Sequence, residues 1–122
     1  MSSFPTQVRG VVDQWSRRTT VGTAIAASAT PICSVASGGA ARTVESVIIN
    51  NPTGGSLTVT LSLDPSGSAA DAVILQESVS AGAYKRYPAT GDVFVHLAEG
   101  DVLNALGSST GLVATVNYKQ AV

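Results

Sequence analysis

One cysteine and one histidine are the residues of this sequence best suited to nucleophilic or metal chemistry. Cys33 lies in an apolar stretch, and His96 is far from it along the chain. A catalytic thiol needs a nearby base, usually a histidine, and a zinc site needs several histidine or cysteine ligands. A single histidine cannot supply a multi-histidine metal site within one chain. We therefore predict that Cys33 is a buried small apolar residue.

Acidic side chains gather near predicted turns in the last third of the chain. Asp92, Glu99 and Asp101 could bind Ca²⁺ through their oxygens, and either aspartate could pair with His96. Their spacing does not match the EF-hand loop, and aspartate is a common turn residue. We interpret these acids as turn-forming residues and His96 as a residue on the outer face of a strand.

Most of the motifs that mark enzymes do not occur in the sequence. There is no Cys-x-x-Cys, no Walker-type loop and no glycine pattern for dinucleotides. Gly107–Gly111 has the spacing Gly-x-Ser-x-Gly, but we interpret this glycine-bounded segment as a turn between two strands rather than as a site. An enzyme needs convergent titratable groups around a nucleophile, a base or a metal. We predict that the protein is not an enzyme and binds no cofactor or metal.

Few residues are charged, and the two signs nearly cancel. Seven Lys and Arg against eight Asp and Glu leave a net charge of -1, and only 12% of residues are charged. The basic residues are too few and too scattered to follow a phosphate backbone, so we expect no nucleic-acid or membrane partner. Low surface charge fits a homo-oligomer whose neighbours cover much of the surface, although Ser, Thr and Asn could also cover it.

The chain after residue 18 alternates with a period of two. The clearest case is 57–64, where Leu57, Val59, Leu61 and Leu63 alternate with polar residues. Further strands are predicted at 20–26, 32–35, 43–51, 73–75, 83–87, 93–97, 102–107 and 113–118. Short strands separated by turn signals indicate an all-β, antiparallel β-sandwich. We prefer a jelly-roll-like topology, with an immunoglobulin-like sandwich as the alternative.

Residues 1–18 differ from this pattern. Apolar side chains recur there at helical spacing, although a proline and a glycine interrupt the segment. We predict an extended or partly helical N-terminal docking arm, 1–18, in front of a sandwich domain, 19–122. Its predicted interface residues are Phe4, Val8, Val12 and Trp15. The arm either docks on a neighbour or packs back on its own sandwich.

Three aromatic residues offer a second kind of contact. Tyr84 and Tyr87 flank two basic residues, and Phe94 faces away from the apolar stripe of its predicted strand. Exposed aromatic rings are platforms on which ligands stack. Tyr84, Tyr87 and Phe94 are therefore possible exposed contacts, and the alternative function is a soluble carbohydrate- or receptor-binding module.

Several segments between about residues 43 and 118 carry a family resemblance. They are Val47–Asn51, Leu57–Leu63, Leu97–Leu103 and Val113–Tyr118. An apolar strand ending in asparagine precedes a polar turn, and a later Leu-x-x-Gly-Asp turn introduces the last hairpin. This arrangement resembles small virion structural proteins of tailed bacteriophages.

The resemblance implies a structural component of a phage or phage-like virion, such as a capsid decoration or head-associated protein. Its implied partners are other virion proteins and further copies of itself. The first residues, Met1–Thr6, lack the basic region and apolar run of a signal peptide. We therefore expect assembly into the virion within a host cytoplasm.

Overall fold

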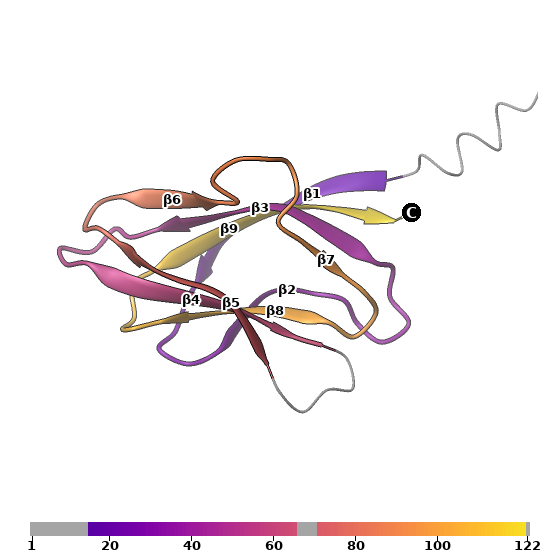
Figure 1. Cartoon of the computed structure of the whole chain (residues 1–122), viewed down its shortest axis with the longest axis horizontal. Helices are drawn as coiled ribbons and strands as arrows, with labels where there is room; N and C mark the ends of the chain where they lie inside the picture. The colour runs from indigo at the N-terminus through magenta and orange to yellow at the C-terminus, as the bar shows by residue number, and fades with distance from the viewer. Residues whose placement is uncertain (1–14, 66–70, 122) are drawn as a thin grey trace, which may run out of the picture.

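The computed structural model describes residues 15–65 and 71–121, where every regular element is a β-strand. The strands are β1 (Trp15–Ala24), β2 (Thr30–Ser34), β3 (Arg42–Asn50), β4 (Leu57–Asp64), β5 (Ala72–Val79), β6 (Tyr84–Tyr87), β7 (Val95–Leu97), β8 (Val102–Gly107) and β9 (Val113–Ala121). They form two antiparallel sheets that pack face to face (Figure 1). The predicted all-β sandwich is confirmed. The described residues contain no helix that could cross a membrane.

The strands pair in a nested order. β4 pairs with β5, β3 with β6 and β7, β2 with β8, and β1 with β9. These nested pairs amount to one long antiparallel hairpin whose innermost pair is β4 and β5. The hairpin is rolled up, so that β9 also pairs with β3 and β8 also pairs with β4. Sheet A then has the order β1-β9-β3-β6, with β7 also beside β3, and sheet B has the order β2-β8-β4-β5. This nesting is a jelly roll, as the strand spacing predicted.

The alternation in β4 sets which of its faces meets the core. Val59 and Leu61 are fully buried, whereas Thr58 and Thr60 on the opposite face stay partly exposed. Because side chains alternate along a strand, a slip of one residue would bring threonine hydroxyls into the core. The apolar pattern thus fixes the register of β4 between β5 and β8.

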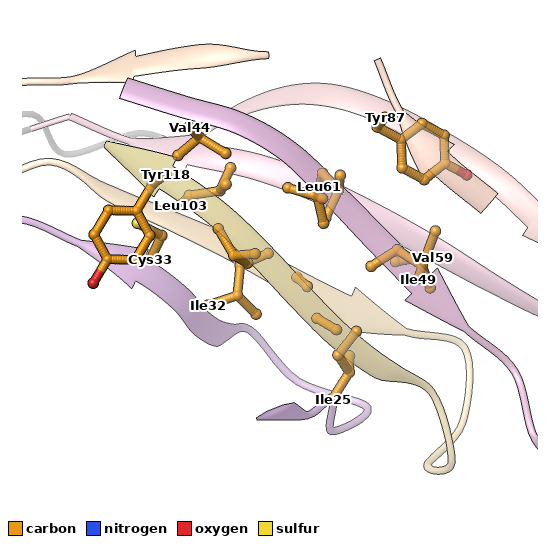
Figure 2. Close-up of a cluster of buried hydrophobic side chains, with 14 of the residues drawn as sticks. Ile25, Ile32, Cys33, Val44, Ile49, Val59, Leu61, Tyr87, Leu103 and Tyr118 are labelled. Carbon is orange, nitrogen blue, oxygen red and sulfur yellow. The ribbon is translucent and has the colours of Figure 1, made fainter. Parts of the chain in front are cut away.

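The core fills the space between the two sheets (Figure 2). Its fully buried side chains include Ile25, Val44, Val47, Ile49, Val59, Leu61, Leu97, Leu103, Leu112 and Val116. Burial of each such side chain stabilises the fold by about 1.5–3 kcal/mol before the opposing loss of entropy. Cys33 is a free, buried thiol within this core, as predicted, and burial raises its pKa.

The first strand begins earlier than the sequence indicated. β1 starts at Trp15, which pairs with Ala121, and Arg18 pairs with Tyr118. The last four residues of the predicted arm therefore belong to sheet A. Residues 17–20 are all exposed, so this edge strand lacks the apolar alternation that reveals a half-buried one. Phe4, Val8 and Val12, like the side chain of Trp15, lie outside the described part of the chain.

Candidate functional site

A shallow depression of about 450 Å³ lies on sheet A. Its lining residues are Arg17 from β1, Glu45 from β3, Arg86 from β6, Lys119 from β9, and Asp92 and Val93 from the segment before β7. Arg17 stands opposite Lys119 in the ladder between β1 and β9. Opposite residues of an antiparallel pair share a face, so both extend from the outer face of sheet A. The depression combines charges of both signs with one exposed apolar side chain.

An ion pair crosses part of this depression. Arg17 Nε lies 3.4 Å from Glu45 Oε1, and the Arg17 side chain is 78% exposed. Water screens such a pair strongly, so it contributes about 0–1 kcal/mol. Because this pair is weak, both side chains can turn to meet charged groups of a partner at little cost.

Arg86, which lines the same depression, is held in place by two hydrogen bonds to the backbone. Its guanidinium donates to the carbonyl oxygens of Pro88 at 2.6 Å and Gly91 at 3.3 Å. These bonds hold the loop that follows β6 and precedes Asp92 and Val93. Carbonyl groups are dipoles without net charge, so these two hydrogen bonds do not neutralise the positive charge of Arg86.

The three predicted aromatic contacts differ in exposure. Tyr84 is 70% exposed, but Tyr87 is only 5% exposed, and Phe94 is partly buried against the core. The prediction that Tyr87 is an exposed contact was wrong. Tyr84 and Tyr87 are three residues apart on one strand, so alternation sends them to opposite faces. Tyr87 shares the inner face with Val47, its partner in β3.

Three of the titratable residues near the last turns make hydrogen bonds within the protein. His96 Nδ1 lies 2.9 Å from Thr43 Oγ1, and Asp101 Oδ2 accepts a bond from the Ala98 amide at 2.9 Å. The Glu99 carboxylate accepts a bond from the Gly38 amide, which joins two loops. Within 15–65 and 71–121, no three His, Cys, Asp or Glu residues lie close enough together to hold a metal ion.

Sequence reasoning did not find the depression, because its residues come from strands far apart along the chain. Arg17, Glu45 and Lys119 become neighbours only through the pairing of β1 and β3 with β9. The sequence does mark Arg86 as part of a basic pair, because it directly follows Lys85. The sequence matches no protein-family model and none of the curated proteins.

Proposed function

We propose that this protein is a non-enzymatic structural component of a phage or phage-like virion, most simply a capsid decoration or head-associated protein. It is assembled in the host cytoplasm and docks on other virion proteins through its N-terminal arm. The resemblance of segments between residues 43 and 118 supports this function. The jelly roll agrees with it, because this fold recurs in viral capsid proteins, although a fold alone does not define a function.

The observation that carries the proposal is the position of the charged depression. The arm enters sheet A at Trp15, two positions before Arg17, whose side chain lines the depression. A partner held by the arm would therefore also meet the outer face of sheet A. Apolar arm residues would provide binding energy, and the mixed charges would orient the partner.

The rest of the sandwich acts as a rigid body in this proposal. Arg42 at the start of β3 donates to the Ser34 carbonyl at 2.7 Å, which joins sheet A to the end of β2 in sheet B. Tyr87 and Glu77 join the sheets at the opposite edge through a hydrogen bond of 3.0 Å. Such cross-links keep the docking face in a fixed shape while it bears on a partner.

The arm is tested by co-sedimentation with particles purified from a lysate that contains the protein. Val8→Asp places a charge in the apolar arm, before the first residue of β1, and we expect the protein to be lost from the particles. Val21→Asp is the matched control, because Val21 is 75% exposed on β1 and lies outside the proposed contact. Retention of Val8→Asp on particles would contradict docking through the arm.

A soluble carbohydrate- or receptor-binding module remains the second candidate, and Tyr84 favours it. Its ring is 70% exposed on β6, and Arg86 lies two residues further along the same face. An exposed ring beside a cation suits stacking on a sugar and bonding to its hydroxyls. In this case Tyr84→Ala abolishes binding to a glycan array, whereas Val8→Asp leaves that binding intact.

A further inference from the structure

The four edges of the two sheets differ in how they are protected. Exposed edges pair with other chains unless charges, prolines, bulges or short length prevent it. β1 carries Arg17 and Arg18, and its pairing is interrupted by a bulge. β2 has only five residues and contains Pro31. β6 has four residues, and two of them are Lys85 and Arg86. Three of the four edges therefore carry features that oppose further pairing.

β5 carries fewer of these features than the other edges, because its one irregularity lies near its start, opposite Leu61 and Ser62. In the described part of the chain it pairs with β4 alone, and its eight residues include no Lys, Arg, Pro or Gly. Val73 is 66% exposed and Ile74 is 39% exposed. After one irregularity, Leu75–Val79 pairs in unbroken register with β4. These five residues present a regular row of backbone groups on their open side, which is the template that an added strand requires.

We infer that β5 accepts the N-terminal segment 1–14 of a second copy of this chain as an added strand. This inference rests on the proposed docking role of the arm and names the surface that receives it. Segment 1–14 lies before β1 and exceeds Leu75–Val79 in length. Its β-branched residues Val8, Val11 and Val12 favour an extended conformation beside a strand.

Side-chain charge does not oppose this pairing. Residues 71–79 carry two acids, Asp71 and Glu77, and no base. Segment 1–14 carries one base, Arg9, and one acid, Asp13, so its side chains have no net charge. The acidic acceptor edge therefore does not repel the donor segment as a whole. The net charge of -1 leaves little repulsion between whole copies.

Donor and acceptor lie at opposite edges of the sandwich. The arm leaves from β1, at one end of the order of sheet A, and β5 ends the order of sheet B at the other edge, where Glu77 meets Tyr87 of β6. A contact that joins two different surfaces of the same protein is heterologous, so each copy both gives and receives an arm. Such contacts form a ring where the rotation between successive copies closes, and a ring would suit a protein placed around a symmetric particle.

The experiment measures the mass of the full chain by light scattering over a range of concentrations, together with amide hydrogen exchange. We expect an oligomer whose formation slows exchange at Leu75–Val79 and leaves exchange at 17–20 unchanged. Val73→Lys and, independently, Ser78→Lys add a charge to the edge and should weaken assembly at least tenfold. Val21→Lys, on the equally exposed β1, is the matched control and should assemble normally.

Val8→Asp separates this inference from the proposed function. Loss of assembly in both Val8→Asp and the β5 variants, each with unchanged circular dichroism, supports arm addition to β5. Loss in Val8→Asp alone places the arm elsewhere and overturns the inference, while docking through the arm stands. Loss in the β5 variants alone indicates pairing of β5 with itself and also overturns it. A chain that stays monomeric at all concentrations overturns it as well, and particle co-sedimentation then decides the proposed function separately.

Discussion

The Tyr87 hydroxyl donates a hydrogen bond of 3.0 Å to Glu77 Oε1, which joins β6 of sheet A to β5 of sheet B. The same carboxylate oxygen lies 3.3 Å from Lys85 Nζ. Glu77 therefore contacts two side chains of β6, the buried Tyr87 and the exposed Lys85. These side-chain contacts join the two sheets at the edge formed by β5 and β6, and the backbone of β5 pairs with β4 alone in the described part of the chain.

Tyr87 makes the free energy of unfolding depend on pH in the alkaline range. Burial, and then the bond and charge of Glu77, raise the pKa of Tyr87 above its ordinary value. The unfolded chain thus loses this proton first, at about pH 10, while the folded chain keeps it. Its contribution to stability is complete below about pH 10 and decreases as the pH rises further.

Tyr87→Phe should therefore reduce the loss of stability above about pH 10, measured as the urea midpoint at a series of pH values. Tyr84→Phe is the matched control, because its ring is 70% exposed. At neutral pH, Tyr87→Phe should cost about 1 kcal/mol for the lost bond. If the urea midpoints of Tyr87→Phe and of the original protein changed with pH in the same way, Tyr87 would not be the group responsible for the alkaline loss of stability.

Asn51 organises the loop between β3 and β4. Its side chain is fully buried, and its Nδ2 donates to the carbonyls of Gly55 and Val79, both at 2.8 Å. Its Oδ1 accepts from the Thr53 amide at 3.0 Å and from the Thr53 hydroxyl at 2.6 Å. Asn51→Ala leaves these buried groups without partners, so we expect a loss of about 3 kcal/mol in urea unfolding. The exposed neighbour gives the control: Asn50→Ala should stay within about 0.5 kcal/mol.

Gly111 sits against Thr53 where the loop after β8 meets the loop after β3. Its φ is +125°, and a Cβ there would lie 2.5 Å from Thr53 Cγ2. Gly111→Ala should cost about 2 kcal/mol through backbone strain and this clash. Thr53→Ser removes Cγ2 and keeps the hydroxyl, so it should recover the steric part in the double variant. Strictly additive unfolding free energies in this cycle would show that the clash does not matter.

Arg42 connects three groups at the start of β3. Its Nε donates to Gln120 Oε1 at 3.0 Å, its Nη1 donates to the Ser34 carbonyl at 2.7 Å, and its guanidinium lies 4.7 Å from the Tyr118 ring centroid. A lysine ammonium cannot reproduce this planar fork. We expect Arg42→Lys to lower the melting temperature, at a cost of about 1–2 kcal/mol. Arg17→Lys, at an exposed ion pair, should change stability by no more than about 0.5 kcal/mol, and equal effects of the two would contradict this reading.

The sequence by itself determined most of the sandwich. The alternation of 57–64 specified β4, and the turn signals at 51–55 and 100–101 separate strands in the structure as they did in the prediction. These signals are local, because alternation and turn chemistry act between residues close in the chain. Local signals also placed Cys33 among buried residues.

The tertiary structure alone decided where β1 begins, which aromatic ring is exposed and which charges meet. Strand β1 is an exposed edge that pairs with β9, so its residues carry no apolar alternation to reveal it. Tyr87 is buried because its face of β6 is the one that meets the core through Val47. Arg17, Glu45 and Lys119 share a depression because of the order β1-β9-β3. Pairing between strands distant along the chain sets each of these features, and no short stretch of sequence contains that information.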